Sequence, residues 1–192
     1  TGAANTAMGY LALDANSTAS NNVAIGSQSL TNNTTGTGNT AVGTLSLLAN
    51  TTADDNTAMG TSALAANTTG ANNTGIGRSA LNANTTASNN TAVGKSALAA
   101  TTTGAENIAI GYLALTNNTT GTHNVAVGSS DGSSGATLGT NSTGSENTAI
   151  GMQALKANTT ASYNTAVGYQ SLYANTTGTE NTAVGYLALQ DA

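Results

Sequence analysis

The chain has 192 residues and a formal net charge of -5, and only 6% of its residues are charged and 3% aromatic. Its three cations are Arg78, Lys95 and Lys156. Nucleic-acid binding needs clustered Lys and Arg, so we expect no nucleic-acid partner. No apolar run approaches the roughly 20 residues of a membrane-spanning helix, so we expect no membrane insertion of this segment. Without cysteine the chain forms no disulfide framework.

One five-residue phrase organises the whole sequence, and Asn39-Thr40-Ala41-Val42-Gly43 is a copy of it. Successive copies start 17 residues apart, except for one interval of 23. A fixed period over the whole chain indicates a repeat architecture, so we interpret residues 1–192 as a single repeat domain. The Asn that opens each copy, numbered position 1 of its repeat, occurs at Asn5, Asn22, Asn39, Asn56, Asn73, Asn90, Asn107, Asn124, Asn147, Asn164 and Asn181.

The residue types at each position predict one coil of a solenoid. Position 2 is Thr, Val or Ile, position 4 is Val, Ile or Met, position 5 is Gly and position 9 is Leu. Side chains alternate along a strand, so positions 2 and 4 share one face and the Ala or Gly at position 3 takes the other. We expect position 4 and the Leu at position 9 to form the core. The Ala and Leu side chains of positions 8–11 should point inward. The Asn-Thr-Thr-Gly phrase, as at 67–70, is typical of a return corner.

A helix is the alternative for the Ala- and Leu-rich stretch, as at 62–66. That stretch is about one turn long, and such short helices do not nucleate well. Seventeen residues are also fewer than the roughly 20 of strand-plus-helix repeats. The sequence therefore predicts an all-β fold, a parallel β-solenoid (β-roll) of eleven 17-residue coils about 50 Å long. In this fold Leu98 points inward between Leu81 and Leu115.

Position 3 never carries a side chain larger than a methyl group. Something must therefore pack closely along that face, either another chain or the opposite wall of the same coil. We expect a self-associating protein, with a monomer as the alternative.

The repeat resembles a known family. Residues 22–29, Asn-Val-Ala-Ile-Gly-Ser-Gln-Ser, are similar to the repeat of the YadA-like heads of trimeric autotransporter adhesins, and residues 107–111 and 124–128 match it too. The longer phrase, with its Asn-Thr-Thr-Gly corner, resembles repeats of bacterial and phage tail-fibre proteins. The period here is longer than in the YadA-like head.

The resemblance implies a left-handed β-roll that forms a homotrimer or fibre. It implies an extracellular location, at the cell surface or in a virion fibre. It also implies attachment to a host surface protein or glycan rather than enzymatic activity.

A second function is possible through the Thr residues of the corner, such as Thr68, Thr85 and Thr102. A regular Thr ladder that orders water is typical of ice-binding (antifreeze) β-solenoids. Because the two Thr of each corner are adjacent, only one per coil faces out.

Nine Asn residues at position 12 begin Asn-x-Ser/Thr sequons and are candidate glycosylation sites. The alternative is a stacked Asn ladder that caps backbone groups at the corner. These residues are Asn16, Asn33, Asn50, Asn67, Asn84, Asn118, Asn141, Asn158 and Asn175.

The 23-residue interval contains a six-residue insert, 131–136, whose removal restores the period of 17. We expect it to leave the coil as a surface loop, where insertions are tolerated and contacts are common. The candidate contact residues are Asp131, Gly132, Ser133, Ser134 and Gly135.

The sequence offers no catalytic residues, no cofactor and no established metal site. His123 is the only histidine, at a corner position where other coils carry Asn, Gly, Glu or Asp. We interpret it as a solvated corner residue, and a weak cation site with Glu106, one coil away, is the alternative. No Ser-His-Asp set or phosphate-binding loop can be assembled from these residues. The tyrosines at position 6 form either a contact stripe or ordinary half-buried surface.

Overall fold

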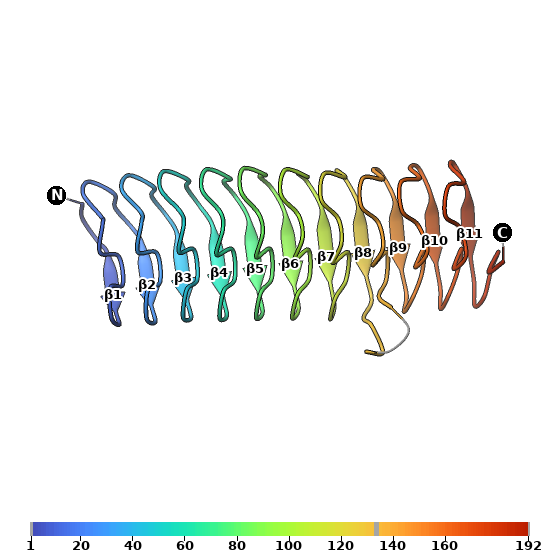
Figure 1. The fold of residues 1–192 in the computed structure, drawn as a ribbon, viewed down its shortest axis with the longest axis horizontal. Coiled ribbons are helices and arrows are strands. Elements are labelled where there is room, and N and C mark those ends of the chain that lie inside the picture. The colour runs from blue at the N-terminus through green and yellow to red at the C-terminus, as the bar shows by residue number, and fades with distance from the viewer. Residues whose placement is uncertain (1, 133–134, 192) are drawn as a thin grey trace.

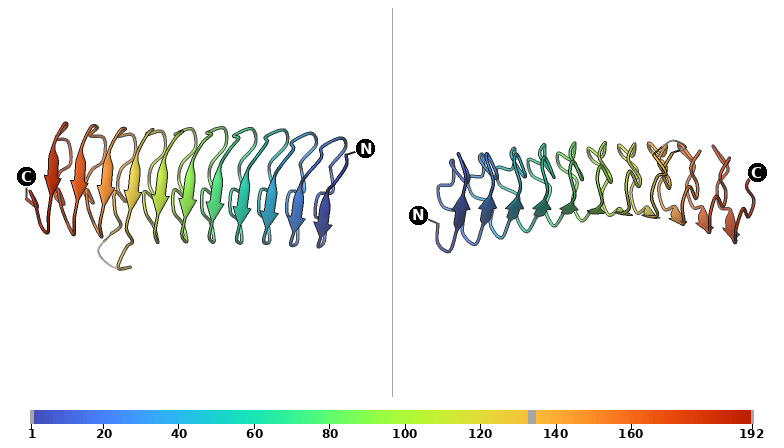
Figure 2. Two further views of the ribbon diagram at one scale, coloured as in Figure 1. Left: turned by 180° about the vertical axis from the view of Figure 1, so that it is seen from behind. Right: turned by 90° about the horizontal axis from the view of Figure 1, so that it is seen from below.

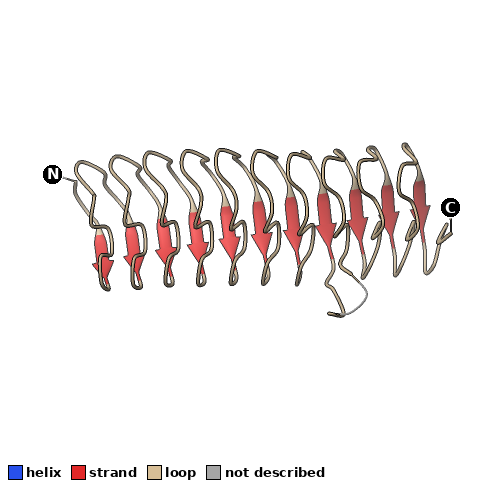
Figure 3. Ribbon diagram, in the orientation of Figure 1, coloured by secondary structure: helices blue, strands red, loops and turns tan. Residues whose placement is uncertain are grey.

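A computed structural model describes residues 2–132 and 135–191 and shows a rod-shaped β-solenoid (Figure 1). One parallel sheet contains all eleven strands in chain order, and the described residues contain no helix (Figure 3). The strands are β1 (Thr6–Met8), β2 (Val23–Ile25), β3 (Thr40–Val42), β4 (Thr57–Met59), β5 (Thr74–Ile76), β6 (Thr91–Val93), β7 (Ile108–Ile110), β8 (Val125–Val127), β9 (Thr148–Ile150), β10 (Thr165–Val167) and β11 (Thr182–Val184).

Equal positions of successive coils stack directly on one another. Thr91 of β6 pairs with Ile108 of β7, and Ala92 pairs with Ala109. The register also holds across the longer interval, where Val125 pairs with Thr148. The 17-residue period therefore sets the register of the whole sheet, as the sequence predicted. The strands lie along one side of the rod and the turns along the other (Figure 2).

The interior of the coil differs from the prediction in one respect. Position 3, not position 4, faces inward: Ala92 is fully buried, whereas Val93 is only partly buried and Ile110 is exposed. A methyl group added at Gly75 would lie 3.3 Å from Leu64 Cγ, so position 3 packs against the Leu of the preceding coil. The opposite wall of the same coil thus explains why position 3 stays small.

The physical reason for the inversion is the width of the coil. A row of buried Leu side chains from Leu13 to Leu172 occupies the interior, as the sequence predicted, and Leu81, Leu98 and Leu115 are all completely buried. The facing wall then has room only for methyl groups, because protein interiors are close-packed. The larger aliphatic side chains at position 4 are left on the outside.

The Ala- and Leu-rich segment is a series of tight turns, neither a strand nor a helix. Positions 7 and 9 have positive φ in a typical coil, at 56° for Ser96 and 51° for Leu98. Position 8 points inward with the Leu, and positions 10 and 11 remain partly or fully exposed in nearly every coil. The inward assignment was therefore correct for positions 8 and 9 only.

Glycine is required at position 5. Gly43 has a φ of 136°, and an added Cβ would lie 2.7 Å from the carbonyl carbon of Gly60 in the next coil. An L side chain would be strained there and would collide with the neighbouring backbone. The stacked glycines let the chain turn at the end of each strand.

Two ladders of stacked Asn side chains, at positions 1 and 12, stabilise the corner that precedes each strand. The side chain of Asn22, at position 1, donates to the Gly36 carbonyl at 2.9 Å, and that of Asn33, at position 12, donates to the same carbonyl at 2.9 Å. The Asn22 Oδ1 also accepts the Asn39 N–H at 2.9 Å. These side chains satisfy buried backbone groups that no strand ladder reaches.

Candidate interaction surface

The outer face of the sheet is the largest distinctive surface of the rod. We call it the sheet face and define it as positions 2 and 4 of the strands. Position 4 is aliphatic in every coil, and no position on the sheet face carries a charge. The position 4 side chains are Met8, Ile25, Val42, Met59, Ile76, Val93, Ile110, Val127, Ile150, Val167 and Val184.

Although none of these side chains is polar, six of the eleven are exposed and the other five are half-buried. Ile110, in the middle of the rod, is 41% exposed, and Ile150 is 39% exposed. Eleven such side chains in one row form a contiguous apolar strip along the rod. Soluble monomers rarely expose such strips, which commonly mark interaction sites.

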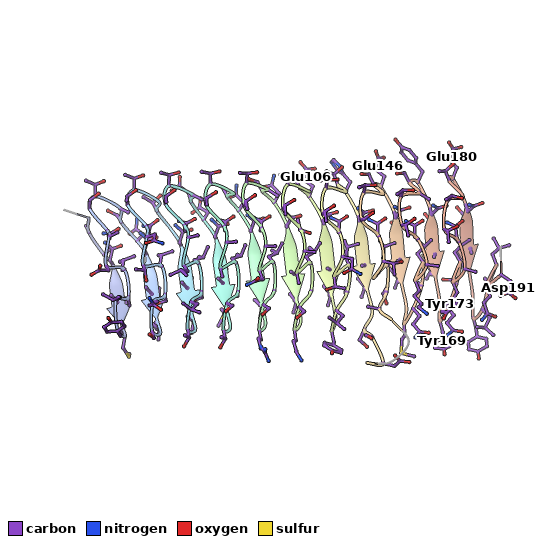
Figure 4. The ribbon with its side chains drawn as sticks, viewed as in Figure 1. Glu106, Glu146, Tyr169, Tyr173, Glu180 and Asp191 are labelled. Carbon is purple, nitrogen blue, oxygen red and sulfur yellow. The ribbon has the colours of Figure 1, made fainter. Side chains whose placement is uncertain are left out.

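Charged residues lie along the two edges of the sheet face. The acidic edge, at positions 16 and 17 just before the strands, carries Asp54, Asp55, Glu106, Glu146 and Glu180. The basic edge, at position 6 just after the strands, carries Arg78 and Lys95. Figure 4 shows Glu106, Glu146 and Glu180 along one edge and Tyr169, a position 6 residue, at the opposite edge. About six residues, or roughly 20 Å of extended chain, separate the edges.

Within the described residues, one acid–base pair lies within ion-pair distance, and it joins neighbouring coils. His123 Nε2 lies 2.7 Å from Glu106 Oε2, with the two side chains 56% and 50% exposed. The sequence placed these residues one above the other. The described part of the chain contains no group of three or more metal-ligating side chains and no pocket.

The Thr residues of the corner form one outward row. Thr103, at position 14, is exposed, as are the equivalent Thr residues along the rod. Thr102, at position 13, is half-buried, and its hydroxyl donates to the Thr119 carbonyl at 3.2 Å. The expected water-ordering ladder of Thr68, Thr85 and Thr102 therefore lies in the half-buried row that bonds the next coil, and position 14 is the row that faces solvent.

The sequon asparagines at position 12 form the stacked ladder that was the alternative to glycosylation. Seven of the nine are fully buried, Asn175 is nearly so, and Asn16 at the end of the rod is partly exposed. In Asn67 the Nδ2 donates to the Gly70 carbonyl at 2.9 Å and to Asn50 Oδ1 at 3.1 Å. A glycan on such a nitrogen would break both bonds and would not fit inside the corner.

The chain leaves the rod between β8 and β9, at the start of the insert (Figure 1). Asp131 and Gly132 are exposed and Gly135 is half-buried, while Ser133 and Ser134 lie outside the described residues. Gln153 Nε2 lies 3.4 Å from Asp131 Oδ2, so the start of the loop rests on the following coil. Ala136, at its end, is buried.

Beyond the insert the surface becomes richer in large polar and aromatic side chains. The Tyr169 and Tyr186 rings stack at 5.4 Å with an interplanar angle of 13°. Lys156 Nζ donates to the Tyr173 hydroxyl at 2.6 Å and lies 4.6 Å from the centroid of that ring. The position 6 tyrosines therefore form a stacked pair only where they occupy consecutive coils.

Sequence reasoning missed two features of this surface: the outward orientation of position 4 and the separation of charge across the sheet face. The second could have been found by writing each charged residue with its position in the repeat. The first has a weaker signal, the restriction of position 3 to Ala and Gly.

No helix in the described residues is long and apolar enough to cross a membrane. No family model, curated protein or solved structure matches the chain.

Proposed function

We propose that the chain is the structural and adhesive shaft or head of an extracellular fibre, and that it self-associates, as a homotrimer, through the sheet face. The observation that carries the proposal is the uncharged aliphatic strip along the whole rod. Its exposure in a single chain is unfavourable, since each buried Å² of apolar surface contributes roughly 25 cal/mol. Another copy, with the same repeat along its axis, matches the strip over its full length.

The proposal places the protein at a cell surface or in a virion fibre, where it contacts a host surface protein or glycan and has no enzymatic role. The resemblance of the repeat to YadA-like heads and tail fibres supports this role. The projecting loop at 131–136 and the tyrosines beyond it supply the side chains that interrupt an otherwise uniform surface. They are the proposed contact region.

The mass of the protein in solution tests the assembly. We expect light scattering to give a multiple of the 18.5 kDa chain mass for the wild type. Ile110→Lys introduces a charge into the middle of the strip and should shift the mass toward a single chain. The matched control is Thr103→Lys, an exposed change outside the sheet face, which should leave the mass unchanged. A folded wild type that stays at 18.5 kDa at high concentration would overturn the proposed assembly.

Ice binding is the second candidate, favoured by the exposed Thr row at position 14. It requires a face that stays open to water, whereas the fibre proposal covers the sheet face with protein. Thermal hysteresis at micromolar protein, abolished by Thr103→Tyr and retained in Ile110→Lys, would favour ice binding at the Thr row. Ice growth unaffected by the wild type would exclude it.

A further inference from the structure

Asp131 is the one Asp or Asn residue of the chain that is followed directly by glycine. The carboxyl group of an aspartate can be attacked by the backbone nitrogen of the next residue, and this closes a cyclic succinimide. A glycine in the next place leaves that nitrogen unshielded, because it has no side chain. The Asp131–Gly132 step is therefore the point of the sequence most susceptible to this reaction.

The structure leaves this step accessible. Asp131 and Gly132 are both exposed, and among the described residues no atom outside its chain neighbours lies within 4 Å of the place that a Cβ of Gly132 would take. The Gly132 N–H donates to Ser130 Oγ at 3.0 Å, a partner two residues back in the same segment. Rotation of this peptide unit thus requires no coil to separate from its neighbour.

Three other aspartates, Asp14, Asp54 and Asp55, are held differently. The backbone N–H that follows each of them donates to a neighbouring coil. A nitrogen held in this way is kept from the carboxyl group unless the stacked coils open locally. The bonds run from Ala15 N–H to the Thr31 carbonyl at 2.9 Å, from Asp55 N–H to the Thr37 carbonyl at 3.0 Å and from Asn56 N–H to Asn39 Oδ1 at 3.0 Å.

The two Asn ladders are protected in the same way against the equivalent reaction, in which ammonia leaves. After Asn56, at position 1, the Thr57 N–H donates to the Asn73 carbonyl at 2.8 Å. The N–H after each position 12 Asn from Asn16 to Asn158 also donates to the next coil. The stacked coils thus suppress ring closure along an Asn-rich chain, and the insert lies outside this protection.

We propose that Asp131 is a site of spontaneous aspartate isomerisation. The Gly132 nitrogen forms a bond to Asp131 Cγ, and the carboxyl hydroxyl and the proton of the nitrogen leave as water. A second water then opens the ring at either carbonyl. Attack at Cγ regenerates aspartate, and attack at the main-chain carbonyl gives isoaspartate, in which the backbone runs through the former side chain. The inference is independent of the proposed function.

Isoaspartate would alter the packing of the loop on the following coil. It lengthens the main chain by a methylene group and moves the carboxylate. Gln153 Nε2 lies 3.4 Å from Asp131 Oδ2, and Gln153 Oε1 accepts the Gln170 side-chain amide at 2.6 Å. Gln153 is 1% exposed, so a carboxylate that moves away leaves a buried amide without this partner.

Peptide mapping of the full chain tests the site. Cleavage after Lys and Arg yields residues 96–156, in which Asp131 is the only aspartate, and residues 1–78, which contain Asp14, Asp54 and Asp55. After incubation of the folded protein at neutral pH, we expect a second form of 96–156 with the same mass and a different retention time. Fragmentation, together with methylation by an isoaspartate-specific methyltransferase, should assign the change to residue 131. Peptide 1–78 should stay unchanged.

Two variants and one condition separate the causes. Asp131→Glu keeps a carboxylate but closes the larger ring poorly, so the second form should disappear. Gly132→Val shields the nitrogen and should slow its accumulation severalfold. Denaturant should raise isomerisation at Asp14, Asp54 and Asp55, which lose their coil-to-coil bonds, and should change the rate at Asp131 little.

Two results would overturn the inference. One is a folded chain that forms no isoaspartate at Asp131 during a period in which the denatured chain forms it. The other is equal accumulation at Asp131 and at the aspartates of peptide 1–78 in folded protein. Neither result changes the mass of the protein in solution, so the proposed assembly is tested separately.

Discussion

Asn84 and Thr101 mark a break in the buried Asn ladder at position 12. Along the ladder the side-chain amide of one Asn donates to the Oδ1 of the previous one, as Asn84 does to Asn67 at 2.7 Å. The next coil has Thr101 instead of Asn, and its hydroxyl donates to the Asn118 carbonyl at 3.1 Å. Among the buried side-chain polar atoms of the described residues, Asn84 Oδ1 is left without a partner.

Restoring the ladder should stabilise the protein. Thr101→Asn supplies a donor to Asn84 Oδ1, and an unpaired buried acceptor costs about 1–3 kcal/mol. We expect the free energy of unfolding to rise by about 1 kcal/mol after loss of the Thr101 hydroxyl bond. Denaturant unfolding measures the change. Thr103→Asn, at the exposed position 14, is the control and should change stability little. A loss of stability on Thr101→Asn would mean that Asn84 is satisfied in another way, for example by water.

The orientation of the strands predicts opposite responses at two neighbouring residues. Ala92→Val adds two methyl groups against buried Leu side chains and should destabilise the coil by about 1–3 kcal/mol through overpacking. Val93→Ala removes surface atoms and should cost well under 1 kcal/mol in a dissociated chain. Thermal unfolding of dilute protein distinguishes the two. Equal losses, or a larger loss for Val93→Ala, would contradict the assignment of position 3 to the interior.

The Leu row should carry a large share of the stability. Leu98→Ala leaves a cavity between Leu81 and Leu115, and such truncations cost about 2–5 kcal/mol. Repeats contact only their neighbours, so hydrogen exchange should rise most in the adjacent coils. Leu113→Ala, at a half-buried position of the following coil, is the matched control with a smaller expected cost. Uniform exchange along the rod would show that the coils unfold as one unit.

The positive φ of position 7 predicts a stabilising substitution. Ser96 has a φ of 56°, a conformation that costs a non-glycine L residue roughly 1–2 kcal/mol. Ser96→Gly relieves this strain, and part of the gain is offset by the greater freedom of Gly in the unfolded chain. We expect a net gain below about 1 kcal/mol in denaturant unfolding. The neighbouring Ala97→Gly, which has no positive φ, should lose stability, and a loss at Ser96→Gly as well would contradict the prediction.

The sequence predicted the architecture because the repeat fixes which residues stack. Once Asn39, Asn56 and their equivalents are aligned, the strands, the register and the place of the insert follow from the period. The period does not determine which side of a three-residue strand faces inward, because positions 2 and 4 are as compatible with a core as with an apolar surface. That choice depends on the width of the coil, which is set by the contact between position 9 and position 3. The outward orientation of position 4 therefore had only a weak signal in the sequence, the restriction of position 3 to Ala and Gly.

Thiol reactivity shows whether the aliphatic row faces outward and whether another copy covers it. Single cysteines are placed at Val93 and at Ala92 in a chain that has none of its own. We expect the Val93→Cys thiol to react rapidly in dilute protein and slowly in concentrated protein. The Ala92→Cys thiol should react slowly at both concentrations while the coil stays folded. Rapid reaction of Val93→Cys at every concentration would contradict coverage of the sheet face, and faster reaction at Ala92→Cys than at Val93→Cys in folded, dilute protein would contradict its orientation.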